Sequence, residues 1–192
     1  MNSPSSTPWP AERAARIRMV ALDVDGVLTD GGIYLDDQGV ESKRFYVRDG
    51  LGIRLLLQAG LRVGLLTARQ SPAVTRRAQE LSLSFVHQGL KDKWGCLQDE
   101  LAKAQWDPVH CLYMGDDWVD LPVLQRVGLA AAPGDADPEV RRQVHWVARA
   151  GGGQGAVREL AEELLRSQNR WGTLLETFQG GRAIPQEEQE KR

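Results

Sequence analysis

The 192-residue sequence contains only two cysteines, Cys96 and Cys111, and they lack the spacing of a zinc or redox motif. Both fall within predicted secondary structure, so we expect reduced core thiols in a cytosolic protein, with a disulfide as the alternative. The sequence has no apolar run long enough to span a bilayer, and its first ten residues lack the apolar segment of a signal peptide. These absences predict a cytoplasmic protein that has no membrane partner.

The chain also has little net charge. Its 24 Lys and Arg residues oppose 26 Asp and Glu residues, which gives a net charge of -2 at pH 7. Proteins that bind nucleic acid or membrane surfaces usually carry excess positive charge, so the composition predicts neither partner. An anionic substrate would therefore need cations placed locally at its site.

Short apolar segments alternate with helical segments along most of the chain, which is typical of an α/β fold with a doubly wound parallel sheet. A flexible lead is expected at residues 1–16, with a turn of helix at 11–16, then one domain at 17–178 and a flexible tail at 179–192. The strands are predicted at residues 18–22, 62–66, 84–87, 109–114, 129–132 and 146–147, and the last helix at 154–167.

One segment departs from this alternation. Residues 33–35 and 43–48 flank the turn-rich segment 36–39, which predicts a β-hairpin over about residues 31–48 that projects from the sheet. Along the second arm, Phe45 and Val47 are expected to face away from Arg44 and Arg48. Because an isolated hairpin is marginally stable in water, its apolar face is expected to pack against another subunit.

Polar residues suited to phosphoryl chemistry follow four of the predicted strands. They are Asp23 and Asp25, then Thr67, then Lys93, then Asp116 and Asp117. Parallel strands place their carboxyl ends at one edge of a sheet, so we expect these side chains to converge. Each residue alone has a structural explanation, such as a helix cap or a surface charge, but this set in this order predicts an active site.

These motifs resemble those of the haloacid dehalogenase superfamily of phosphatases. The segments DVDGVLTDG at 23–31, VRDGLGIR at 47–54 and GGQGAVRE at 152–159 are similar to the 3-deoxy-D-manno-octulosonate 8-phosphate phosphatase family. The resemblance covers about residues 17–167, with one departure, Ala68, where the family commonly has glycine. It implies a Rossmann-like core with no cap domain and hydrolysis of that sugar-acid phosphate in lipopolysaccharide precursor synthesis. It also implies a homotetramer in which a C-terminal tail reaches a neighbour's site.

The resemblance implies a role for each strand-end residue. Asp23 would be the nucleophile that forms an aspartyl-phosphate, and Asp25 would protonate the leaving sugar oxygen and then activate water. Because a phosphate ester and carboxylates repel each other, a cation is expected, and oxygen ligands suit Mg²⁺. The expected metal ligands are Asp23, Asp116 and the backbone carbonyl of Asp25, and Asp117 is expected to support them. Thr67 and Lys93 would contact the phosphoryl oxygens.

Residues that face the sugar are less defined by the motifs. Arg69, two residues beyond Thr67, is the better candidate, and Arg48 and Asp49 are two more. The glycine-rich stretch at 151–155 lacks the GxGxxG spacing and predicts a tight turn. Four tryptophans are expected in the core or at an interface: Trp94, Trp106, Trp118 and Trp146.

Several alternatives stay open. Asp25 favours phosphate ester chemistry over dehalogenation, and the segment between Lys93 and Asp116 is too short for a large cap domain. The substrate could instead be a nine-carbon ulosonic acid 9-phosphate. A non-catalytic assembly domain is a further alternative, as is a phosphoacceptor receiver domain, although the order of strand-end residues differs from that of receivers.

Overall fold

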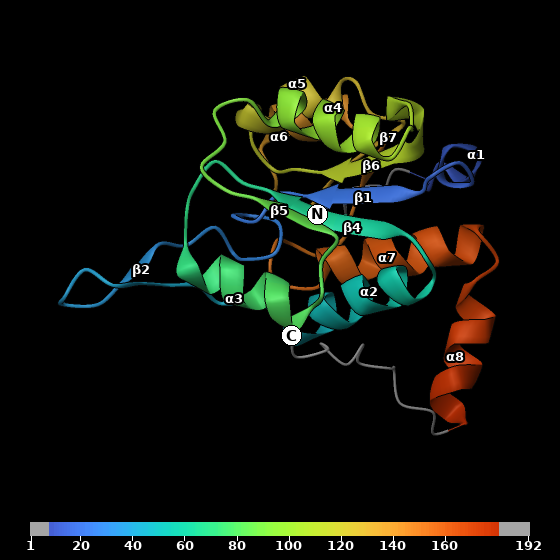
Figure 1. The fold of residues 1–192 in the computed structure, drawn as a ribbon, viewed down its shortest axis with the longest axis horizontal. Coiled ribbons are helices and arrows are strands. Elements are labelled where there is room, and N and C mark those ends of the chain that lie inside the picture. The colour runs from blue at the N-terminus through green and yellow to red at the C-terminus, as the bar shows by residue number, and fades with distance from the viewer. Residues whose placement is uncertain (1–7, 181–192) are drawn as a thin grey trace, which may run out of the picture.

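The computed structural model describes residues 8–180, which form an α/β fold around a central parallel sheet (Figure 1). The predictions for the ends of the chain fall mainly on residues 1–7 and 181–192, outside the described residues. The six strands lie in the order β5-β4-β1-β6-β7-β8. Their bounds are β1 (Met19–Leu22), β4 (Arg62–Leu66), β5 (Phe85–His87), β6 (Cys111–Met114), β7 (Leu129–Ala132) and β8 (Trp146–Val147). The predicted doubly wound parallel sheet is confirmed.

Strand β1 lies inside the sheet, hydrogen-bonded to β4 on one side and β6 on the other. All four of its residues are buried, which explains its uninterrupted apolar sequence. Leu22 is in register with Leu65 of β4 and with Met114 of β6. The three strands therefore end nearly level, and the residues that follow them emerge at one edge.

Alternate residues of β1 face two separate cores. Val20 and Leu22 pack under α2 (Val47–Gln58), α3 (Pro72–Glu80) and α7 (Ala156–Ser167), while Met19 and Ala21 pack under α4 (Lys93–Lys103), α5 (Leu121–Leu124) and α6 (Pro138–Gln143). Figure 1 shows these two helical layers below and above the sheet. No helix within residues 8–180 has both the length and the apolar character needed to cross a bilayer.

The shorter elements complete the fold. Two single turns of 3₁₀ helix are η1 (Pro108–His110) and η2 (Trp118–Asp120), and α1 (Ala11–Ala14) contacts α7. Helix α8 (Trp171–Gln179) also contacts α7 and was not predicted. Its apolar residues Trp171, Leu174, Leu175 and Phe178 recur at helical spacing, a signal in the sequence that the prediction did not use.

The predicted hairpin is present but shorter than expected. Its strands are β2 (Tyr34–Leu35) and β3 (Glu41–Ser42), and the hairpin projects from one end of the molecule (Figure 1). The predicted second arm over residues 43–48 is wrong, because α2 begins at Val47 and takes both Val47 and Arg48 into its first turn. Gly50 and Gly52, early in α2, lower its helix propensity, so the sequence pattern did not indicate that the helix begins at Val47.

Both cysteines are free thiols, as predicted. Cys111 is buried in β6, and Cys96 is partly buried in α4. Burial raises the pKa of both thiols, which keeps them protonated and unreactive. They therefore act as small core side chains.

Candidate active site

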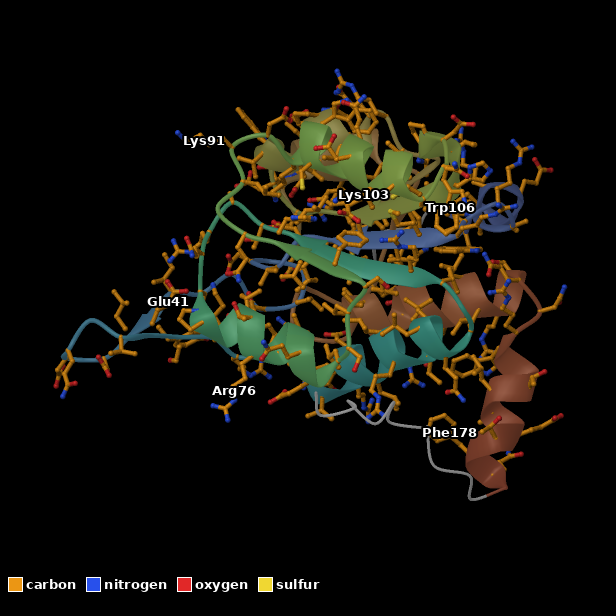
Figure 2. The ribbon with its side chains drawn as sticks, in the orientation of Figure 1. Glu41, Arg76, Lys91, Lys103, Trp106 and Phe178 are labelled. Atoms are coloured by element: carbon orange, nitrogen blue, oxygen red, sulfur yellow. The ribbon has the colours of Figure 1, made fainter. Side chains whose placement is uncertain are left out.

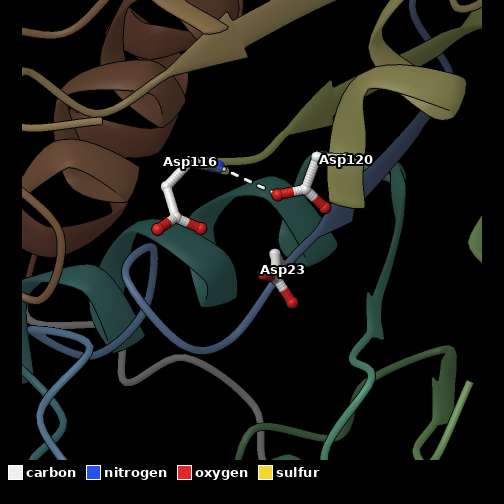
Figure 3. Close-up of side chains that lie close together, drawn as sticks. All are labelled: Asp23, Asp116 and Asp120. Atoms are coloured by element: carbon white, nitrogen blue, oxygen red, sulfur yellow. Dashed lines mark hydrogen bonds between the residues drawn. The ribbon is translucent and has the colours of Figure 1, made fainter. Parts of the chain in front are cut away.

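Three aspartates meet at the carboxyl edge of the sheet (Figure 3). Asp23 directly follows β1, Asp116 lies just beyond β6, and Asp120 ends η2. One carboxylate oxygen from each residue lies within 4.8 Å of the others. Asp23 is 5% exposed and Asp120 is fully buried, so the cluster is largely withdrawn from water. A compact set of carboxylate oxygens has the chemistry of a Mg²⁺ site.

The hydrogen bonding of the cluster fits a divalent cation. The Oδ1 atom of Asp116 is buried and has no hydrogen-bond partner among the described residues, while the buried Oδ1 of Asp23 has only the Lys93 ammonium group beside it, at 3.0 Å. A buried carboxylate oxygen without a partner is unfavourable, and a cation between the two residues would offset that cost. Asp23 and Asp116 therefore fit the metal-ligand role that the sequence predicts for them.

Asp120 has a different role, because its oxygens are already occupied. Its Oδ1 accepts from Lys93 at 2.7 Å and from the Tyr113 hydroxyl at 2.6 Å. Its Oδ2 accepts from the backbone N–H groups of Asp116 at 3.0 Å and Asp117 at 3.3 Å. Asp120 thus fixes the loop that carries Asp116 and holds Lys93 beside Asp23.

The sequence analysis missed Asp120. The available signal was its position three residues after Asp117, where an acid completes a reciprocal cap with the Asp117 side chain. Asp117 itself was predicted to support the metal ligands. Its side chain is exposed and accepts from the N–H of Trp118 at 2.7 Å, so the structure places it at the start of η2 rather than inside the cluster.

Lys93 is the buried cation of the site. It begins α4, and its Nζ lies 3.0 Å from Asp23 Oδ1 and 2.7 Å from Asp120 Oδ1. Burial works against its charge, but the carboxylates of Asp23 and Asp120 outweigh that effect and raise the pKa of Lys93. Lys93 is therefore a fixed positive charge beside the predicted nucleophile.

The two predicted metal ligands have strongly shifted acidity. Burial, together with the negative charge of Asp120, raises the pKa of Asp23 to about 7 even though Lys93 opposes the shift. Burial and the charges of Asp23 and Asp120 raise the pKa of Asp116 to about 8. Without a bound cation both carboxyl groups hold protons near neutral pH, and a cation would favour their charged forms.

Asp25 lies in a second group of charges, which we term the Asp25 network: Asp25, Glu41, Lys43 and Arg69. Lys43 contacts Asp25 Oδ1 and lies 3.1 Å from Glu41 Oε1. Arg69 pairs with Glu41, and its Nε lies 3.9 Å from Asp25 Oδ2. Glu41 and Lys43 come from the base of the hairpin, so this network joins the hairpin to the loop after β1.

The sequence analysis also missed Glu41 and Lys43. Both lie within the predicted hairpin, and nothing in the sequence pattern gave their side chains a common direction. Lys43 and Arg69 keep the pKa of Glu41 below its ordinary value, although its side chain stays partly exposed. Glu41 is therefore held in its charged form by the two cations.

Thr67 follows β4 at the same sheet edge and is buried. Its Oγ1 accepts from the backbone N–H of Arg69 at 3.2 Å, and its own N–H donates to the His87 carbonyl at 3.0 Å. These bonds hold the loop between β4 and α3, so Arg69 is presented beside Asp25 with its side chain about half exposed.

Arg48 and Asp49 are not brought to the cluster. Arg48 is exposed in the first turn of α2. Asp49 is buried and accepts from the backbone N–H groups of Gly155 at 3.2 Å and Arg158 at 2.8 Å, at the start of α7. Burial raises the pKa of Asp49 to about 6 against the lowering effect of those bonds. The structure therefore gives Asp49 a helix-capping position.

Two glycines keep the site compact. Gly26 has φ +81°, and a Cβ there would lie 2.0 Å from Asp116 Oδ2, so only glycine leaves room for that carboxylate. The predicted tight turn at 151–155 packs directly on this loop, because a Cβ at Gly152 would lie 1.9 Å from the Gly26 carbonyl oxygen. The N–H of Gly153 donates to the Val27 carbonyl at 3.0 Å, which ties the two loops together.

Comparison with known proteins gives consistent relatives, although no protein-family model matches the chain. It is 42% identical over 159 residues to 3-deoxy-D-manno-octulosonate 8-phosphate phosphatase KdsC of Yersinia pestis, covering 83% of this chain and 85% of the relative. Identity to the KdsC of Escherichia coli K12 is 41%, covering 82% and 84%.

A solved structure is also similar. The crystal structure of the same phosphatase from Moraxella catarrhalis, in complex with magnesium, phosphate and KDO, aligns with a TM-score of 0.85 at 38% identity, covering 88% of this chain and 97% of that one. Fold and sequence similarity therefore extend over nearly the whole described region.

Proposed function

This chain belongs to the 3-deoxy-D-manno-octulosonate 8-phosphate phosphatase family of HAD-type phosphoric monoester hydrolases, and we propose that it releases phosphate from that sugar-acid ester. The observation that carries the proposal is the buried cluster in which Lys93 lies 3.0 Å from Asp23, with Asp116 beside them. Fixed positive charge next to a carboxylate nucleophile is the arrangement that phosphoryl transfer requires.

The proposed reaction proceeds in two steps. A carboxylate oxygen of Asp23 bonds to phosphorus as the bond from phosphorus to the sugar oxygen breaks, and Asp25 gives its proton to that oxygen. Asp25 then accepts a proton from the water that attacks phosphorus, which frees phosphate and regenerates Asp23. Splitting the hydrolysis into two displacements lets one pair of carboxyl groups serve both halves of the reaction.

The surrounding residues stabilise the charge that moves in these steps. Asp23, Asp116 and the backbone carbonyl of Asp25 would hold Mg²⁺, which when bound neutralises the phosphoryl oxygens. Lys93 holds the Asp23 carboxylate in place and faces the phosphoryl oxygens of the substrate. The Thr67 hydroxyl donates a hydrogen bond to the same phosphoryl oxygens. Asp117 supports the loop that carries Asp116.

Recognition of the sugar is assigned to side chains at the rim of the site. The half-exposed guanidinium of Arg69 suits a carboxylate, since Arg binds carboxylates through two parallel hydrogen bonds. Arg48 and Asp49 remain predicted sugar contacts, although the hydrogen bonds of Asp49 favour a structural role. The proposed product is a free sugar acid for lipopolysaccharide precursor synthesis in the cytoplasm, a compartment that the two free thiols support.

The proposed assembly is a homotetramer. The hairpin exposes Ile33, Leu35 and Val40 at 60%, 63% and 58% of their surface. A two-stranded hairpin with this much apolar surface gains stability by packing against copies of itself. This supports a second copy of the chain as the partner of the hairpin.

The proposal is tested by measuring phosphate release with and without Mg²⁺. Eight-carbon and nine-carbon ulosonic acid phosphates are compared, and the eight-carbon ester is expected to have the higher kcat/KM. Asp23→Asn should lower kcat by at least about 10³-fold while keeping the folded state, because the amide cannot form the aspartyl-phosphate. Asp99→Asn, on the exposed side of α4, is the matched control and should retain activity. Phosphatase activity retained by purified Asp23→Asn would refute the assignment.

A further inference from the structure

Lys43 is an unusual lysine. Its side chain is only 2% exposed, and its Nζ contacts Asp25 Oδ1 and lies 3.1 Å from Glu41 Oε1. Most lysines keep the ammonium group in water, because burial removes its hydration and costs the flexible side chain its rotamer entropy. The two carboxylates offset that cost and hold the ammonium group in one place.

The position of Lys43 links the hairpin to the predicted acid. Lys43 directly follows β3, while Asp25 lies in the loop after β1. Glu41, labelled in Figure 2, lies at the base of the hairpin and also pairs with Arg69. Since Arg69 Nε is 3.9 Å from Asp25 Oδ2, the Lys43 contact is the closer of the two that fix the Asp25 carboxylate.

We propose that Lys43 is a positioning residue that orients the Asp25 carboxyl group for proton transfer to the leaving sugar oxygen. The proposal rests on the proposed phosphatase function. Lys43 binds Oδ1 of Asp25, which leaves Oδ2, 3.9 Å from Arg69 Nε, as the oxygen that carries the proton. Glu41 holds the Lys43 ammonium group from the opposite side, so the base of the hairpin becomes part of the catalytic unit.

A purely structural role for Lys43, as an ion pair that anchors the hairpin, makes a different prediction. An anchor affects every substrate equally, because it acts through the shape of the whole site. A residue that orients the acid matters only where the leaving group needs a proton. A sugar alkoxide is strongly basic and needs that proton, whereas 4-nitrophenolate is a weak base and leaves without it.

The experiment compares kcat/KM for the eight-carbon sugar-acid phosphate and for 4-nitrophenyl phosphate at saturating Mg²⁺. The constant kcat/KM covers the steps up to cleavage of the ester bond, so it reports the role of Asp25 as an acid and not its later role as a base. Lys43→Met should lower kcat/KM for the sugar ester about 10²-fold, the size of a typical general-acid contribution, and for the aryl ester by less than about threefold. Lys43→Arg should recover most of the loss.

The control is Lys91→Met, at the exposed lysine labelled in Figure 2, which should leave both values unchanged. Should Lys43→Met fail to fold, Glu41→Gln removes the second anchor of Lys43 and should give the same selective loss, about tenfold. Equal losses on both esters, or no loss on the sugar ester, would overturn the positioning role. Wild-type protein that hydrolyses neither ester would instead refute the phosphatase function itself.

Discussion

Asp23 and Asp116 place two carboxyl groups in one largely buried space, where burial and the negative charge of Asp120 make the ionisation of both less favourable. Their folded-state pKa values of about 7 and about 8 lie above the ordinary value of 3.8. The folded protein therefore binds more protons than the unfolded chain between these limits. The stability that this provides is complete below about pH 4 and is lost as the pH rises through the folded values.

We therefore expect the metal-free protein to lose stability from about pH 4 to about pH 8, between the unfolded and the folded pKa values of these groups. Each fully contributing group changes the unfolding free energy by about 1.4 kcal/mol per pH unit. Mg²⁺ should flatten this dependence, because it binds the ionised carboxylates and replaces the protons. Thermal unfolding with EDTA and with Mg²⁺ across this range measures both effects, and Asp116→Asn should have a smaller slope without metal. A slope that Mg²⁺ leaves unchanged would contradict this account.

The same residues show what the sequence could predict about the site. Asp23, Thr67, Lys93 and Asp116 were found because each directly follows a strand or begins a helix, and strand ends converge in a parallel sheet. Asp120 and Lys43 follow no such rule. Asp120 has only the local capping signal three residues after Asp117, and Lys43 has none. Their importance comes from what they contact across the fold, and those contacts depend on tertiary packing.

At the level of elements, the loop after β1 depends on Gly26. Gly26→Ala should lower Mg²⁺ affinity by at least about tenfold, because a Cβ there lies 2.0 Å from Asp116 Oδ2 and would displace that ligand. Gly60→Ala is a matched control, since Gly60 has nearly the same φ, +82°, with nothing within 4 Å of the added Cβ. Both variants should lose about 1 kcal/mol of stability from backbone strain. Calorimetric Mg²⁺ titration separates them, and equal affinities would exclude the proposed contact.

The start of α7 depends on a side chain from α2. Asp49→Ala should destabilise the protein by about 1–2 kcal/mol, because the N–H groups of Gly155 and Arg158 lose their acceptor. Asp49→Asn, which keeps one acceptor oxygen, should be less affected. Denaturant unfolding measures the loss, and KM for the sugar ester should change by less than about twofold. A rise in KM without a loss of stability would support the sugar-contact prediction from the sequence.

Most helices and strands could be predicted from the sequence where their buried residues follow the spacing of a single type of element. The strands were found as short, mostly apolar segments, and three of them, β1, β4 and β6, are followed within two residues by a polar residue of the site. The start of α2 could not be predicted, because Val47 is exposed and the glycines that follow weaken the helical signal. The structure explains one of these glycines through helix packing: a Cβ at Gly52 would lie 3.1 Å from the Cα of Arg158 in α7.

On the scale of the whole molecule, the projecting hairpin governs assembly. Ile33→Glu combined with Leu35→Glu should convert the proposed tetramer to monomers, because charges would replace the apolar surface that copies share. Light scattering at working concentration gives the mass. Val109→Glu, an exposed apolar position in η1, should leave the mass unchanged. A wild-type mass equal to the monomer would remove the tetramer proposal.

The interior position of β1 has a consequence for how the chain is made. β1 is among the first segments to leave the ribosome, yet its partner β6 is synthesised only after more than half of the chain. Until then, one edge of β1 has no partner, and Asp23 has no Asp116 beside it. During synthesis the interior strand of the finished enzyme is an open edge strand, the kind of surface on which nascent chains associate with one another and which chaperones cover.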